Sequence, residues 1–297
     1  MNEHDYLFDK SGPRDPEVAR LEHLLGRFRH DADRPAPSAR RRLPLAVPLL
    51  LAAAVALVTL GWWATRADES VDLMRSDGAR VARDVWIEAR GEAEHLTMPD
   101  VGWLTLAPGG RLRVRRLDRE QGHLWLEQGR LEAFVLPSVR PRFFRVETTA
   151  TTCVDLGCKY VLDVDPSSQR AHVRVTLGKV AFTDDGREVY VPRDAECTAE
   201  PGRRVGTPRF VDCPPELRRF LDEFDAAREP QDRRAAALAL AGASMGVRDT
   251  LPLWHLLADD DSEVRQSARQ ALVRLVGSAP LEDTLVAWRE HLEPNWR

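Results

Sequence analysis

The sequence predicts a multi-domain membrane protein with a short helical tail, one transmembrane helix, an all-β sandwich or roll, and a small all-α C-terminal domain. Three observations predict this class. Residues 43–64 carry no charge, residues 85–200 alternate polar and apolar side chains, and residues 214–297 repeat apolar side chains at helical spacing. The net charge of −4 lacks the basic excess of nucleic-acid-binding proteins, so we expect no direct nucleic-acid partner.

Residues 1–42 form the predicted cytoplasmic tail. Its helical pattern places five apolar side chains on one face: Val18, Leu21, Leu24, Leu25 and Phe28. A tail of this length cannot bury such a face in a core of its own. We therefore expect the helix to dock in a partner's groove, with a partly disordered or an interfacial helix as the alternatives.

Residues 43–65 form the predicted transmembrane helix. The uncharged run would reach about 33 Å as a helix, which is enough to cross the hydrocarbon core. It is too long, and begins too far into the chain, for a cleavable signal peptide. Arg40, Arg41 and Arg42 precede it, so the positive-inside rule places the tail in the cytoplasm. We expect a single-pass protein of the bacterial inner membrane, with most of the chain in the periplasm.

A polar connector, 66–84, leads to the predicted β domain, 85–200. Segments such as RLRVRRL, KYVLDVD and AHVRVTL alternate with a period of two, and glycines recur between them. Many short strands with frequent turns favour an antiparallel sandwich or roll.

A linker, 201–213, precedes the predicted helical domain, 214–297. One helical stripe consists of Val264, Ala268, Ala271, Leu272 and Leu275. The acidic run before Ser262 supplies a helix cap at its start. The segment TLPLWHLLADDDSEVRQSARQALVRLVG resembles one HEAT-type helical hairpin, so we expect HEAT-like packing.

Motifs for catalysis and for cofactors are absent from the sequence. There is no phosphate-binding G-x-x-x-x-G-K-[ST] loop and no G-x-S-x-G nucleophile motif. The histidines after the tail are scattered, without metal-ligand spacing: His95, His123, His172, His255 and His291. We expect no catalytic residue, no cofactor and no metal, and hence no enzyme.

The four cysteines all follow the predicted membrane segment: Cys153, Cys158, Cys197 and Cys213. In an oxidising compartment they are expected to form two disulfides, in preference to half of a zinc site. Four cysteines allow three pairings, among which the spacing does not choose.

Five segments resemble the FecR domain of bacterial envelope regulators: DVGWLTLAPGGRLRV, LWLEQGRLEAFV, PRFFRVETTATTCVDLGCKYVLDVD, AHVRVTLGKVAF and VYVPRDAE. The resemblance covers residues 85–200. It implies an all-β periplasmic sensor domain and control of an extracytoplasmic-function sigma factor by the tail. Similarity to FecR-like proteins with cysteines at matching positions implies a Cys158–Cys197 bridge, which leaves Cys153 for Cys213.

The resemblance and the apolar face together predict a signal-transducing regulator, an anti-sigma factor in type. Its tail would contact the sigma factor through seven apolar residues: Tyr6, Leu7, Phe8, Leu21, Leu24, Leu25 and Phe28. The periplasmic domains would meet an envelope protein or a glycan. The alternative is a membrane-anchored envelope scaffold, whose tail serves only as an anchor.

Overall fold

The computed structural model describes residues 16–26, 71–184, 187–243 and 245–296. The chain divides into two compact units, Met1–Thr65 and Arg66–Arg297. The described part of the first unit is helix α2, Pro16–Gly26, which buries none of its residues.

The second unit contains a 14-stranded sheet in its described part. The strands are β1 Met74–Arg75, β2 Trp86–Glu88, β3 Glu94–Met98, β4 Gly102–Leu106, β5 Arg111–Leu117, β6 Gly122–Val135, β7 Phe144–Glu147, β8 Thr152–Asp155, β9 Lys159–Val164, β10 Ala171–Leu177, β11 Lys179–Thr183, β12 Glu188–Pro192, β13 Ala195–Ala199 and β14 Arg209–Phe210. The main path runs β12-β11-β8-β7-β6-β9-β10-β13-β14. The described pairs are antiparallel except β6 with β7, which is parallel.

Strand β6 divides this sheet into two half-sheets. Its first part pairs with β5 and β7, and its second part pairs with β4 and β9. Leu124 and Leu126 are buried in the first part, whereas Leu131 and Ala133 are buried in the second, so the buried positions change from even to odd. Gly129 lies at this change with a φ of +90°, and the register with β5 shifts nearby. An extra residue in a strand turns the following side chains to the other face, so both parts of β6 face the core.

The helical part follows β14. It consists of α4 Pro215–Ala226, α5 Pro230–Gly242, the 3₁₀ helix η1 Val247–Asp249, α6 Thr250–Leu256, α7 Ser262–Val276, α8 Leu285–Leu292 and the 3₁₀ helix η2 Glu293–Trp296. Helices α6 and α7 contact each other, as do α4 with α5 and α5 with α7. Asp261 caps α7 by accepting from the N–H of Glu263, and Gly277 ends the helix in the left-handed conformation.

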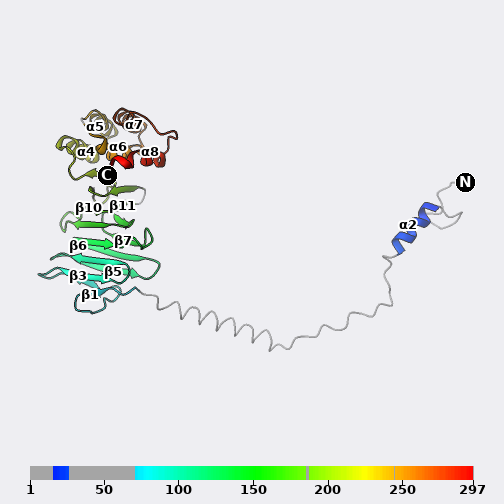
Figure 1. Cartoon of the computed structure of the whole chain (residues 1–297), viewed down its shortest axis with the longest axis horizontal. Helices are drawn as coiled ribbons and strands as arrows, with labels where there is room; N and C mark the ends of the chain where they lie inside the picture. The colour runs from blue at the N-terminus through cyan, green and yellow to red at the C-terminus, as the bar shows by residue number, and fades with distance from the viewer. Residues whose placement is uncertain (1–15, 27–70, 185–186, 244, 297) are drawn as a thin grey trace. The chain divides into compact units, whose positions relative to one another are not determined.

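The helices lie next to β10 and β11 in Figure 1, and α6 contacts β14, one end of the strand path. Strand β12 is an edge of the sheet, and α6 covers it: His255 Nε2 donates to the carbonyl oxygen of Tyr190 over 2.9 Å. Burial lowers the pKa of His255 to about 3, so the neutral ring makes this bond. Buried side chains of sheet and helices form one hydrophobic cluster. An edge strand has unpaired backbone N–H and C=O groups that can pair with a strand of another chain. A helix that covers the edge prevents this pairing.

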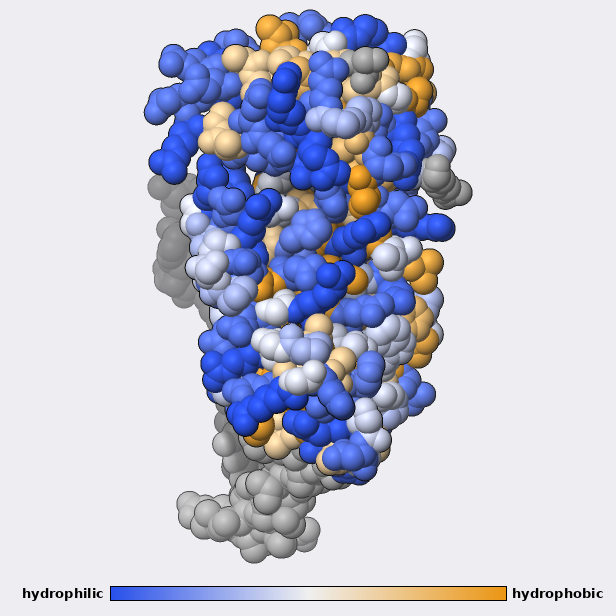
Figure 2. Space-filling model, turned by 90° about the vertical axis from the view of Figure 1, so that its left-hand side faces the viewer, coloured by the Kyte–Doolittle hydropathy of each residue, from blue (hydrophilic) through white to orange (hydrophobic). Residues whose placement is uncertain are grey.

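One face of the second unit is mainly polar. Figure 2 shows one face on which hydrophilic side chains dominate and apolar ones gather in small, separate groups. Scattered apolar groups of this kind are ordinary on a folded surface.

The predicted fold class is corrected at its membrane helix. Within the residues that the structure describes, no helix is long and apolar enough to span a membrane. The longest of them, α7, has 15 residues and would reach only about 22 Å. The segment predicted to cross, 43–65, lies outside the described residues, so the predicted orientation and localisation stay predictions. The β and α parts, predicted as separate domains, lie in one compact unit.

Candidate functional site

Helix α2 presents three of the predicted contact residues on its surface. Leu21, Leu24 and Leu25 are 57%, 48% and 59% exposed. Positions three and four apart in a helix share a face, so these leucines form one apolar surface, the α2 face. The other predicted contacts, Tyr6, Leu7, Phe8 and Phe28, lie outside the described residues.

The four cysteines are free thiols, and all four are buried. This corrects the predicted disulfides. Register pairs Cys197 in β13 with Val173 in β10, and Val173 with Leu162 in β9. Cys158 directly precedes β9, so it lies two strands away from Cys197. Neighbouring strands are about 4.8 Å apart, and twice this spacing exceeds the Cα–Cα distance that a disulfide can bridge. Cys153 in β8 and Cys213 beyond β14 belong to different half-sheets.

The segment Asp155-Leu156-Gly157-Cys158 forms a turn between β8 and β9, in which Asp155 and Cys158 are buried. The Cys158 thiol donates to Asp155 Oδ1 over 2.6 Å, and the N–H of Gly157 donates to Oδ2 over 3.1 Å. Burial raises the pKa of Asp155, and it also raises the pKa of the Cys153 and Cys158 thiols. A protonated, buried thiol is a poor nucleophile, so this turn has a structural role.

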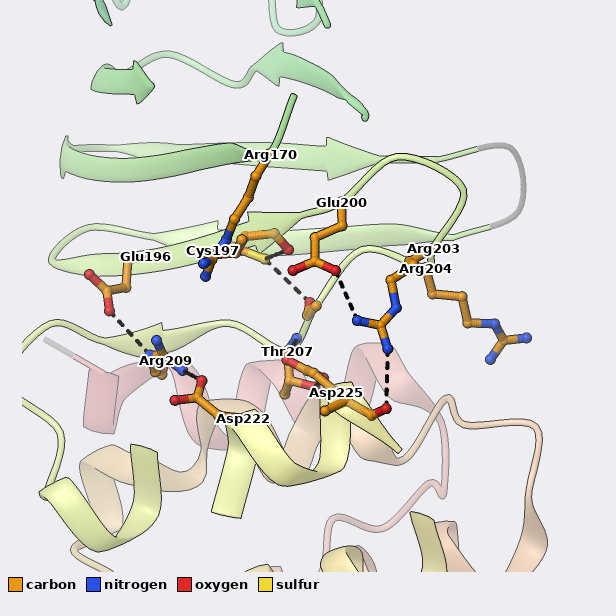
Figure 3. Close-up of a pocket in the computed structure, with 13 residues that line it drawn as sticks. Arg170, Glu196, Cys197, Glu200, Arg203, Arg204, Thr207, Arg209, Asp222 and Asp225 are labelled. Atoms are coloured by element: carbon orange, nitrogen blue, oxygen red, sulfur yellow. Dashed lines mark hydrogen bonds and ion pairs between the residues drawn. The ribbon is translucent and has the colours of Figure 1, made fainter. Parts of the chain in front are cut away.

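A charged pocket of about 310 Å³ lies between β13, the segment through β14, and α4 (Figure 3). Four arginines and four acidic residues line it: Arg170, Arg203, Arg204, Arg209, Glu196, Glu200, Asp222 and Asp225. Figure 3 shows Arg170 reaching in from the strands and the two aspartates rising from the helix on the opposite side.

Ion pairs within the protein occupy most of these charges. Arg209 contacts Glu196 at 3.1 Å and Asp222 at 2.6 Å, and Arg218 contacts Glu196 at 3.0 Å. Arg203 pairs with Glu200 at 2.8 Å. Glu196 is nearly buried, and hydrogen bonding from His172 and then from Arg209 lowers its pKa to about 2. The ion pairs of Arg209 and Arg218 connect β13 and β14 to α4.

The half-buried carboxyl group of Asp225 completes this pocket. Asp225 of α4 accepts from the N–H of Thr207 at 2.8 Å and from its hydroxyl at 2.7 Å, while burial raises its pKa. Arg170 is exposed and has no ion pair within the described chain. Most charged side chains of the pocket are paired with other side chains of the protein. They therefore join the sheet to α4 and leave few charges for a ligand.

The candidate histidines do not meet in the structure. His123 lies 2.7 Å from Glu147, and His95 lies 3.0 Å from Thr105. His255 belongs to α6 and is buried against the Tyr190 backbone. Among the residues that the structure describes, no group of three or more histidines, cysteines or carboxylates could hold a metal ion.

Sequence reasoning missed the contacts that join distant segments. The Tyr190 hydroxyl donates to Glu293 Oε1 over 3.1 Å, although 103 positions separate these residues. The ring centres of Trp254 and Trp296 lie 6.1 Å and 6.4 Å, respectively, from the ring centre of Tyr190. The only sequence signal for this cluster is the presence of aromatic residues in the last helices, which does not identify their partner in the sheet.

Comparisons with known proteins give a partial likeness. No family model and no curated protein matches the chain. Two crystal structures, at 2.50 Å and 1.65 Å resolution, of a candidate anti-sigma factor from Parabacteroides distasonis ATCC 8503 align with 40% of this chain at 19% identity, with a TM-score of 0.36. The chain spans 56% and 57% of the length of those structures. A likeness this limited carries no argument about fold or function.

Proposed function

We propose that this chain is a non-catalytic regulator that binds a sigma factor, of the extracytoplasmic-function class, through the α2 face. The observation that carries the proposal is the exposure of Leu21, Leu24 and Leu25 on a helix that buries none of its residues. The FecR resemblance of residues 85–200 supports a sigma factor as the partner. Residues 66–297 would receive the signal that governs this contact.

Docking of this face is energetically reasonable. An isolated helix of 11 residues is marginal in water, and binding in a groove would stabilise it. Covering the half-exposed leucines would contribute about 1 kcal/mol each. The polar side of α2, which includes His23, would remain in solvent.

A photo-crosslinking experiment in cells tests this proposal. A photoreactive residue replaces Leu21, and the captured protein is identified by mass spectrometry. We expect a sigma factor to be captured. The double substitution Leu24→Ala, Leu25→Ala should reduce capture at least tenfold and change expression of the sigma factor's target genes.

The matched control is His23→Ala, which alters the opposite side of the same helix. It should leave both capture and expression unchanged. Capture that is insensitive to the leucine substitutions, or that yields no sigma factor, would refute the proposal.

A further inference from the structure

A second cavity, of about 470 Å³, lies where the turns between strands meet the C-terminal 3₁₀ helix η2. The β8–β9 turn contributes Leu156 and Gly157, and the β10–β11 junction contributes Gly178 and Lys179. The rest of the wall consists of Tyr190, Pro192, Arg193, Asp194, Glu293 and Trp296. Its volume lies in the range of small-molecule sites.

The aromatic walls present apolar surface to this cavity. The Tyr190 hydroxyl donates to Glu293, and the Trp296 indole N–H donates to the hydroxyl of Thr250 over 3.0 Å. Their polar groups are therefore satisfied inside the protein. The two rings are only 8% and 4% exposed, so each contributes a narrow strip to the wall, beside buried Pro192 and half-buried Leu156.

Two glycines keep one wall of the cavity free of side chains. Gly178 has a φ of +71°, and a Cβ at this position would lie 2.0 Å from the carbonyl oxygen of Gly157. The two turns can touch only because position 178 has no side chain. Gly157, with a φ of +89°, likewise contributes only backbone.

Lys179 supplies the available cation. Its ammonium lies 5.3 Å from the centre of the Tyr190 ring and forms a loose ion pair with Glu293, whose Oε1 lies 3.9 Å away, beyond hydrogen-bonding distance. By contrast, Lys159 makes a 2.9 Å pair with Glu132. Within the described chain, no acceptor lies within hydrogen-bonding distance of the Lys179 ammonium. Its N–H groups therefore remain available to a ligand.

The other charged side chains of the cavity also have partners. Glu293 accepts from Tyr190, and Arg193 pairs with Asp194 at 3.3 Å. One available ammonium beside aromatic and apolar walls is complementary to a flat apolar ligand that carries a single negative charge.

We propose that this cavity binds a small aromatic carboxylate, with its ring against Tyr190 and Pro192 and its carboxylate on Lys179. A charge-assisted hydrogen bond to the ammonium would fix the orientation of the ligand. This site goes beyond the proposed function, because it lies in the second unit and requires no contact with α2.

Calorimetric titration of the full chain tests the site with two probes of similar shape, 2-naphthoate and the neutral 2-naphthalenemethanol. We expect naphthoate to bind at least tenfold more tightly than the alcohol. Lys179→Met should remove this preference. Lys159→Met, which removes a paired lysine elsewhere in the sheet, should retain it.

Lysine footprinting on the unmodified protein provides a test that does not depend on variant folding. The chain has three lysines, Lys10, Lys159 and Lys179, so acetylation at each is resolved by mass spectrometry. Naphthoate should slow acetylation of Lys179 and leave Lys159 unaffected. Undetectable binding of naphthoate, equal affinity for both probes, or unprotected Lys179 would overturn the proposal.

Discussion

Asp155 shows at the scale of one residue how a short sequence motif acquires a structural role. Its carboxyl group is fully buried and accepts hydrogen bonds from Gly157 and Cys158 within the same turn. Cys158, which the sequence predicts to form a disulfide, instead donates a hydrogen bond from its thiol to Asp155. The expected compartment favoured oxidation, but the register of β9, β10 and β13 keeps Cys158 and Cys197 apart.

We predict that all four cysteines are free thiols in the purified protein. Mass spectrometry of the full chain, alkylated with iodoacetamide in denaturant without reductant, should show four additions. The folded protein should react far more slowly, because all four thiols are buried and burial raises their pKa. Cysteines that become reactive only after reduction would contradict the free-thiol structure.

At the scale of the element, strand β6 determines how the sheet folds over. The alternation of LWLEQGRLEAFV predicts a strand, but it does not show that the two parts join different half-sheets. Gly129 makes this possible, because its positive φ and lack of a side chain permit close contact with Gly110.

The substitution Gly129→Ala tests this role. A Cβ at position 129 would lie 2.5 Å from the Cα of Gly110, so backbone must move in addition to the strain of a positive φ. We expect a loss of about 3 kcal/mol in the free energy of unfolding, measured with urea. Gly157→Ala is the control: its φ is similarly positive, but no atom lies within 4 Å of its Cβ position, so the loss should be about 1 kcal/mol. Equal losses would contradict the proposed close contact.

At the scale of the whole molecule, the contacts between sheet and helices make the second unit continuous. Glu196 in β13 forms ion pairs with Arg209 in β14 and with Arg218 in α4. His255 and Tyr190 join α6 to the edge strand β12. Because these contacts cross the boundary between the β and α parts, we expect both parts to unfold together.

Glu196→Gln tests this coupling. Hydrogen bonding from His172, then from Arg209, lowers the pKa of Glu196 from 4.5 to about 2. Because the folded pKa is depressed, the ionised group stabilises the protein fully above pH 4.5, and this contribution disappears as the pH falls towards 2. The variant should lose about 2 kcal/mol at pH 7 and progressively less below pH 4.5.

Circular dichroism and tryptophan fluorescence should report the same shifted transition for this variant. The control Glu200→Gln removes a more exposed pair with Arg203 and should change stability by less than about 0.5 kcal/mol. Separate transitions for the two probes would show that sheet and helices unfold independently.

Local structure could be predicted from the sequence alone: the strands of KYVLDVD and AHVRVTL, the stripe and cap of α7, and the shared face of Leu21, Leu24 and Leu25. These features depend on side-chain period and on neighbours within a few positions, which a sequence displays directly. Three features could be found only in the folded chain: the separation of the cysteines, the ion pairs of Glu196, and the cavity beside Lys179. Each of these depends on strand register and on contacts between segments far apart in the chain, and a one-residue shift in register would change them all.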